Sequence, residues 1–269
     1  MKQLLFSLAL TPIFAIITAI PVKAEIRTSV IEYKHGDTIL EGYLAFDDEI
    51  KGPRPGVMVV HAWKGLGKYE KRRARELAKL GYVAFAADIY GKGIRPQNNQ
   101  EAAKQATIYR SNRKLMRERA LAGLRVLKRQ RLVNFQKTAA IGYCFGGGVV
   151  LELARSGARV DGVVSFHGNL DTPNPQDASR IRGKVLVLQG ASDPLVPIAQ
   201  VDGFIQEMDA ARVDYQLVMY GNAVHSFSNP NAGDDPSTGV AYNAKADRRS
   251  WQDLKTFFAE IFKNRFASK

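Results

Sequence analysis

The sequence predicts an α/β fold in which a mostly parallel, doubly wound sheet is flanked by helices. Short apolar runs rich in β-branched residues alternate along the chain with amphipathic segments, which is the pattern of parallel strands joined by crossover helices. No internal repeat, low-complexity tract or long linker interrupts this alternation. We therefore assign residues 25–269 to a single domain, and we expect its ligands to bind beyond the carboxyl ends of the strands.

Strands are expected where apolar and β-branched residues run together between turn signals. The first two flank the turn-forming sequence KHGDT, which predicts an opening hairpin. The later runs are apolar along most of their length, as buried strands of a parallel sheet are. The expected strands cover residues 27–33, 39–46, 54–63, 82–89, 137–143, 160–168, 184–190 and 214–220.

Helices are expected where apolar residues recur at a spacing of three and four. Gly81 and Gly157 follow two such segments and mark their ends. One long helical stretch is expected from about Glu101 to Gln130. The expected helices cover residues 69–81, 101–130, 146–157, 197–213 and 248–266.

The first 24 residues have the composition of a cleavable signal peptide. Lys2 gives a short positive start, residues 4–20 are apolar, and the sequence VKA at 22–24 puts small residues where signal peptidase cuts. We expect cleavage after Ala24 and export to the periplasm or the medium, without stable membrane insertion afterwards. The alternative is an uncleaved anchor, but an apolar segment of about 17 residues is at the short limit for spanning a bilayer.

The chain is basic, with a formal net charge of +13. Such a charge can attract nucleic acid or anionic lipid. Here the basic residues are spread along expected helices, such as residues 68–80 and 110–131, with glutamates between them. That pattern is typical of solvated helix faces, and no nucleic-acid-binding motif accompanies it. We therefore expect a small-molecule substrate and no nucleic-acid partner.

Cys144 is the only cysteine of the chain, so no internal disulfide is possible. It lies in the sequence GYCFG, between an expected strand and an expected helix, which is the setting of a G-x-nucleophile-x-G elbow. Gly142 and Gly146 are small enough to let strand and helix approach, and the amides that open the helix favour a thiolate. The alternative is a small core residue. A glycine-rich nucleotide loop would need a different spacing.

A nucleophile of this kind needs a base, and the base needs an orienting group. Among the four histidines, His225 lies in a loop after the last expected strand, and Asp193 follows the strand before it. The chain order of nucleophile, acid and histidine is that of an elbow-type hydrolase. Asp193 could instead cap a helix. His61 and His167 also end strands and could line a pocket, whereas His35 lies in the hairpin turn.

The sequences GYCFGG, GASDPLVP and YGNAVHSF, together with residues 61–93, resemble the dienelactone hydrolase family, the cysteine branch of the α/β-hydrolases. The resemblance extends from about Arg27 to the closing helix. It implies an α/β-hydrolase fold and a Cys144–His225–Asp193 triad. It also implies an oxyanion hole built from the backbone amides of Phe145 and Trp63.

The resemblance further implies hydrolysis of an ester or lactone through an acyl-enzyme. Members that act in the muconate pathway carry a glutamate where this chain has Ala62, and they hold the substrate carboxylate with arginines that have no secure match here. Substrate contacts are expected from side chains in the loops that follow the strands: Tyr90, Lys92, Arg95, His167 and Phe227.

Two other functions are compatible with the same residues. An acyltransferase or thioesterase would use the same triad with a different acceptor. A thiol redox sensor or ligand-binding protein would use Cys144 without hydrolysis, but a sensor usually has a resolving cysteine, which this chain lacks. No cofactor is expected, and no metal, because the histidines lack ligand spacing and one cysteine cannot form a thiolate cage.

Overall fold

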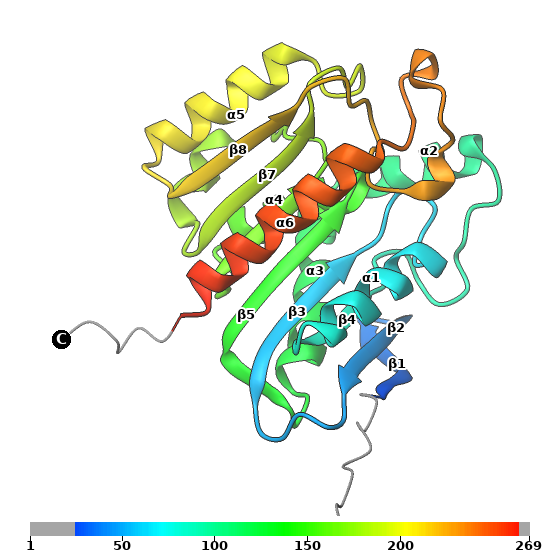
Figure 1. Cartoon of the computed structure of the whole chain (residues 1–269), viewed down its shortest axis with the longest axis vertical. Coiled ribbons are helices and arrows are strands. Elements are labelled where there is room, and N and C mark those ends of the chain that lie inside the picture. The colour runs from blue at the N-terminus through cyan, green and yellow to red at the C-terminus, as the bar shows by residue number, and fades with distance from the viewer. Residues whose placement is uncertain (1–24, 264–269) are drawn as a thin grey trace, which may run out of the picture.

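Eight strands form one continuous sheet in the computed structural model, which describes residues 25–263 (Figure 1). In chain order the strands are β1 (Ile26–His35), β2 (Thr38–Asp47), β3 (Arg54–Val60), β4 (Val83–Ala87), β5 (Val133–Tyr143), β6 (Gly162–Phe166), β7 (Lys184–Gly190) and β8 (Tyr215–Tyr220). Their order in the sheet is β1-β2-β4-β3-β5-β6-β7-β8. β1 and β2 form the expected antiparallel hairpin, β2 pairs antiparallel with β4, and all other neighbours run parallel. The expected fold class is confirmed. The expected signal peptide, residues 1–24, lies outside the described residues.

Helices cover both faces of the sheet, which is why every residue of β4 and of β6 is buried. α1 and α6 pack on one face through residues such as Leu77 and Phe258, and Figure 1 shows both in front of the sheet. The other helices pack on the opposite face through residues such as Leu124, Val149 and Phe204. None of the helices within residues 25–263 is long and apolar enough to cross a membrane. The helices are α1 (Lys68–Lys79), α2 (Asn99–Arg110), α3 (Arg113–Lys128), α4 (Phe145–Arg155), α5 (Ile198–Ala210) and α6 (Ala244–Ile261).

The long helix expected at 101–130 is two helices, so that prediction was wrong. α2 ends at Arg110, and the Ser111 hydroxyl donates to the Thr107 carbonyl at 2.8 Å. The Asn112 side chain then accepts from the Leu115 N–H at 3.0 Å and opens α3. An asparagine that caps a new helix competes with continuation of the old one. The end of α2 contacts two loops at the carboxyl edge of the sheet, because the Tyr109 hydroxyl donates to the Tyr90 carbonyl at 3.1 Å and Arg110 donates to Asn169 at 2.8 Å.

The closing helix starts earlier than its apolar pattern indicates. Asn243 caps α6 by accepting from the backbone N–H groups of Lys245 and Ala246. The helix therefore begins at Ala244 rather than at Arg248, because alanines alternate with charged residues in its first turn and give only a weak apolar pattern. The last expected residues, 264–266, lie outside the described residues.

Candidate active site

Cys144 lies on the sharp turn between β5 and α4, with φ 53° and ψ −116°. A non-glycine residue with positive φ carries strain that the surrounding fold must sustain. The two neighbouring glycines explain how the turn closes. A Cβ on Gly142 would lie 1.9 Å from the Gly146 carbonyl oxygen, and one on Gly146 would lie 2.4 Å from that of Val60. Any larger residue at either position would push the strand and the helix apart.

The structure brings Cys144, His225 and Asp193 into one hydrogen-bonded chain. The Cys144 Sγ lies 3.0 Å from His225 Nε2, and His225 Nδ1 lies 2.9 Å from Asp193 Oδ2. Asp193 is held in turn by the Gln189 side chain at 2.8 Å and the Leu195 backbone N–H at 2.9 Å. All three members of the chain are buried. A thiol, an imidazole and a carboxylate in this order can act as nucleophile, base and orienting group.

Topology explains why residues so far apart in sequence meet. Cys144 follows β5, Asp193 follows β7 and His225 follows β8. These strands run parallel within one sheet, so their carboxyl ends lie at the same edge. The loop that contains His225 is anchored by backbone pairing of His225 with Gly239 and Ala241, which keeps the imidazole pointing toward the thiol.

The site favours a charged thiolate–imidazolium pair. Burial raises the pKa of the Cys144 thiol, but the charge and hydrogen bond of His225, the Phe145 N–H and the Arg110 guanidinium outweigh it, so the thiol pKa is lowered. Burial lowers the pKa of His225, but the negative charges and hydrogen bonds of Cys144 and Asp193 raise it overall. Each member of the pair thus stabilises the charge of the other.

Alkylation of Cys144 by iodoacetamide is expected to follow an apparent pKa below about 8.5, the value of a free thiol. The pKa of the thiol is lowered because the imidazolium of His225 stabilises the thiolate, which is therefore available at lower pH. In His225→Ala the thiolate loses this partner, and only the Phe145 N–H and Arg110 still oppose the effect of burial. The apparent pKa of the thiol should therefore rise. The measurement is the alkylation rate of both proteins from about pH 5 to pH 10. Superimposable profiles for the two proteins would contradict the pairing.

Trp63, whose amide is the second expected oxyanion donor, lies in the loop that follows β3, at the same edge of the sheet. The Tyr90 hydroxyl donates to the Trp63 carbonyl at 3.0 Å, and the Ala62 carbonyl lies 2.7 Å from His61 Nδ1. The Ile89 N–H donates to His61 Nε2 at 3.1 Å, so the proton of this imidazole is on Nδ1. Burial lowers the pKa of His61 to about 4, which keeps it neutral. His61 therefore orders the loop beside the site and is not a second base.

Glu70 is a buried carboxylate near this loop that the sequence analysis missed. It extends from α1 and accepts from the Ala62 N–H at 3.1 Å and from the Gly67 N–H at 2.9 Å. Burial raises the pKa of Glu70, although both amide donors oppose that shift. The signal for it in the sequence is a glutamate three residues after Gly67, the position of the glutamate in a capping box.

Arg110 is the other residue that the sequence analysis missed. It is the last residue of α2, its Nη2 donates to the Asn169 Oδ1 at 2.8 Å, and its charge contributes to the lowered pKa of Cys144. Only the break between α2 and α3 brings this guanidinium over the site. Periodicity within one long helix would have placed it on a solvated face.

The residues expected to contact substrate lie in different surroundings. Tyr90 is buried, and its ring lies 5.3 Å from that of Phe145, beside the elbow.

Lys92 forms an ion pair with Glu32 of the opening hairpin, away from the thiol. Arg95 donates to the carbonyls of Leu66, Gly91 and Ile94. The side chains of His167 and Phe227 are buried and lie edge to face at 5.1 Å. The structure therefore brings Tyr90 close to the elbow, while Lys92 is paired with strand β1 and Arg95 is held by backbone carbonyls of its own loop and of the loop after β3.

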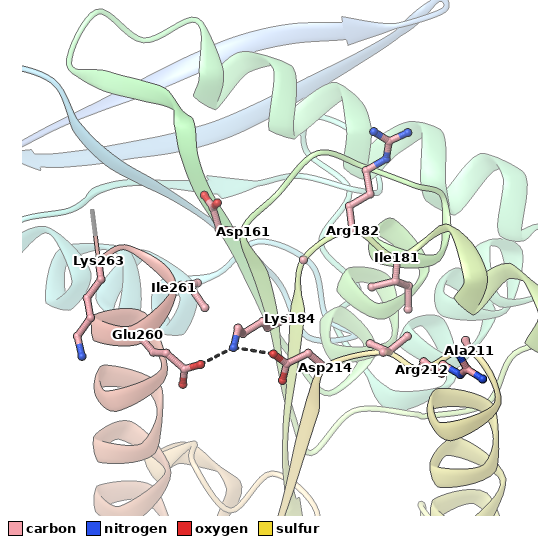
Figure 2. Close-up of a pocket in the computed structure, with 12 residues that line it drawn as sticks. Asp161, Ile181, Arg182, Lys184, Ala211, Arg212, Asp214, Glu260, Ile261 and Lys263 are labelled. Carbon is pink, nitrogen blue, oxygen red and sulfur yellow. Dashed lines mark hydrogen bonds and ion pairs between the residues drawn. The ribbon is translucent and has the colours of Figure 1, made fainter. Parts of the chain in front are cut away.

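A hollow of about 460 Å³ lies at the opposite edge of the sheet (Figure 2). Lys184 begins β7 and Asp214 immediately precedes β8, so the hollow is at the amino ends of the parallel strands. Lys184 Nζ lies 2.6 Å from Asp214 and 2.5 Å from Glu260. Dashed lines mark these two ion pairs in Figure 2. The hollow is thus separate from the cysteine site. Within residues 25–263 no cluster of histidine, cysteine, aspartate or glutamate is arranged to hold a metal ion.

Comparison with known proteins agrees with this architecture. The model of the dienelactone hydrolase family matches residues 40–262. A protein of Saccharolobus solfataricus named "Putative carboxymethylenebutenolidase" is 26% identical over 249 residues, which cover 79% of this chain and 92% of the relative. The solved structure of a dienelactone hydrolase-like promiscuous phosphotriesterase from metagenomic libraries is 39% identical, with a TM-score of 0.84 over 89% of this chain and 99% of that one. A dienelactone hydrolase from Anabaena variabilis is 17% identical, with a TM-score of 0.64 over 87% and 98% of the two chains, and shares the fold.

Proposed function

The chain belongs to the dienelactone hydrolase family of ester and lactone hydrolases, and from this premise we propose that it cleaves its substrate through a Cys144–His225–Asp193 triad. The observation that carries the proposal is the continuous chain of contacts from thiol to imidazole to carboxylate, at 3.0 and 2.9 Å. Catalysis by such a chain requires a nucleophile within reach of its base and a base held by a third group.

In the proposed reaction the Cys144 thiolate attacks the carbonyl carbon of the ester or lactone. The resulting oxyanion is held by the backbone amides of Trp63 and Phe145, and each such donor is worth about 3–4 kcal/mol in the transition state. The C–O bond then breaks, and the His225 imidazolium donates its proton to the leaving oxygen. Water, deprotonated by His225, attacks the thioester and releases the acid together with the free thiol.

Turnover of p-nitrophenyl acetate tests this proposal. The purified, reduced protein should release one nitrophenol per Cys144 in a rapid burst, as the thiol is acylated. A slower steady release should follow as the acyl-enzyme is hydrolysed. An acyltransferase would show the same burst, but its steady rate would rise on addition of an acceptor alcohol or thiol. A thioesterase would still pass the acyl group to water, and it would cleave an acyl thioester faster than the oxygen ester. A redox sensor or binding protein would give neither burst nor turnover while fully reduced, and that result would contradict hydrolysis.

A second substrate class is favoured by one relative. The phosphotriesterase that is 39% identical to this chain covers nearly its whole described length. Attack on a phosphotriester makes the same demands on a site, because a nucleophile adds while an oxygen gains negative charge. We therefore propose phosphotriesters as additional substrates, and paraoxon is the probe. Nitrophenol release from paraoxon by wild type but not by Cys144→Ala is the expected result.

We also propose that the protein is exported. The support is the n-region, apolar segment and VKA site of residues 1–24. Expressed from its full sequence in a bacterium, the protein should be recovered outside the cytoplasm with Glu25 as its first residue. Intact-mass measurement of the recovered chain checks this. A full-length chain that remains in the cytoplasm would contradict export.

A further inference from the structure

We infer that His167 is a positioning residue that sets the distance between the Cys144 nucleophile and the His225 base, an inference that rests on the proposed function. His167 was expected to line the substrate pocket. In the structure it lies between the two loops that carry these groups, and it is hydrogen-bonded to both. No other side chain among residues 25–263 makes these two contacts.

On one side His167 holds the backbone of the elbow. The Cys144 N–H donates to His167 Nδ1 at 3.2 Å, and it also points to the Phe166 carbonyl oxygen at 3.0 Å. Because Nδ1 accepts this bond, the proton of the neutral imidazole is on Nε2. The elbow is therefore tied to β6 by a side chain as well as by the sheet.

On the other side His167 holds the loop of the base. Its Nε2 lies 2.8 Å from the Ser228 hydroxyl, and Ser228 follows His225 by three residues. Ser228 is anchored independently from α1, because its hydroxyl lies 2.8 Å from the Tyr69 hydroxyl and its carbonyl accepts from Arg73 Nη2 at 2.9 Å. The two loops are thus linked twice: directly by the contact between the Cys144 thiol and His225, and indirectly by the hydrogen bonds of His167 to the Cys144 N–H and to Ser228.

The backbone at this position indicates that the imidazole has a specific use. His167 has φ 40°, and Ser226 in the loop of the base has φ 60°. Residues other than glycine hold such angles only under backbone strain, and residues of this kind concentrate at functional sites. His167 is 1% exposed, so water does not replace its hydrogen bonds. A bulky side chain in this conformation, with a hydrogen bond at each ring nitrogen, fits a bridge between the elbow and the loop of the base better than it fits a pocket wall.

The charge state of His167 suits this role. Burial lowers the pKa of His167 well below its ordinary value, and the nearby positive charges of His225 and Arg73 lower it further. The rings of His167 and His225 lie edge to face at 5.3 Å, and Tyr143 is the other titratable ring beside His167, at 6.1 Å. A neutral His167 does not compete with His225 for the proton of the thiol. It can therefore orient the pair without taking part in proton transfer.

Two variants cut the bridge from opposite ends. His167→Asn keeps a polar acceptor near Cys144 and tolerates positive φ, but it does not reach Ser228. Ser228→Ala removes the hydroxyl and leaves the histidine in place. The matched control is Ser165→Ala, because Ser165 is a buried serine of β6 whose hydroxyl has no partner within the described part of the chain.

The readouts are kcat and KM per titrated active site, the alkylation profile of Cys144 against pH, and the melting temperature. We expect His167→Asn and Ser228→Ala to lower kcat by about 10- to 100-fold with little change in KM, since small misplacements of reacting groups have effects of this size. Both variants should also move the alkylation profile to higher pH, because the thiolate loses part of its imidazolium partner. Ser165→Ala should leave kcat and the alkylation profile as in wild type.

The outcomes separate this inference from the proposed function. If either bridge variant is less stable but keeps the wild-type alkylation profile and kcat per active site, His167 is structural only and the inference is overturned. Alkylation needs no substrate. A shifted profile in a protein that hydrolyses no ester would therefore uphold His167 as a positioning residue while removing the proposed reaction.

Discussion

Replacing Cys144 with alanine is expected to lower ester turnover by at least about a thousandfold, because the reaction then has no nucleophile. His225→Ala should lose a similar factor, since the thiol is buried and has no other imidazole within hydrogen-bonding distance among residues 25–263. The double variant Cys144→Ala/His225→Ala should be no worse than either single variant. Residues that act as one unit are non-additive in this way. The measurement is kcat/KM for p-nitrophenyl acetate in all three proteins.

His35→Ala is the matched control for this series. His35 lies at the end of β1, in the opening hairpin, and its imidazole faces Glu118 at 3.5 Å. Its loss should leave kcat/KM unchanged, and each variant should keep the circular dichroism spectrum of the wild type. If Cys144→Ala retained more than about a tenth of the wild-type turnover, the thiol would not be the nucleophile and the proposed reaction would fail.

The largest stability effect is expected at the buried ion-pair cluster behind the elbow helix. Arg155 ends α4, and its guanidinium binds both carboxylate oxygens of Glu207 in α5, at 2.7 and 2.6 Å. It also donates to Glu152 at 3.1 Å, and the other Glu152 oxygen accepts from Arg117 of α3 at 2.8 Å. The side chains of Arg155, Glu152 and Glu207 are almost fully buried. The cluster ties three helices together on one face of the sheet.

Glu207→Ala should lower the free energy of unfolding by about 3–5 kcal/mol, because it leaves the Arg155 charge buried with too little compensation. Urea unfolding followed by circular dichroism measures the change. Glu260→Ala is the control, since Glu260 forms an exposed pair with Lys184, and such pairs contribute about 0–1 kcal/mol. Equal losses in the two variants would show that burial does not govern the contribution of Glu207.

A third variant separates the charge from the packing. Arg155→Met combined with Glu207→Leu replaces both partners with apolar side chains of similar length. Because the buried cation and its Glu207 partner are removed together, while Glu152 keeps its ion pair with Arg117, the double variant should be more stable than Glu207→Ala alone. The Arg155 guanidinium also donates to the Leu170 carbonyl in the loop after β6 at 2.9 Å. The double variant loses that bond as well, so its turnover of ester should fall slightly even where its stability is restored.

The outline of the fold and the three members of the candidate triad were predictable from the sequence because their signals are local. A buried strand needs a continuous apolar run, and the elbow needs glycines two residues before and after Cys144. Once strands are parallel, the residues that follow them meet at one edge without further information. Asp193 and His225 could therefore be placed beside Cys144 from chain order alone.

The surroundings of the triad were decided by contacts between distant segments. His167 was expected in a pocket wall because the sequence indicates only that it ends a strand. Its role depends on Ser228, 61 residues later, and the position of Ser228 depends on Tyr69, 159 residues earlier. The break at Asn112, after which Arg110 contacts Asn169, is by contrast a local cap on the Leu115 N–H, which periodicity does not reveal.

Local patterns of hydrophobicity and turn residues thus determined the strands, the helices other than the separate α2 and α3, their order along the chain, and the nucleophile, acid and base that we propose. Only the tertiary structure decided which buried polar groups share hydrogen bonds. The physical reason is that a buried polar side chain must find a partner, and the partner is chosen by distance in the fold. Sequence separation carries no information about that distance. Arg155 and Glu207, 52 residues apart, are an example.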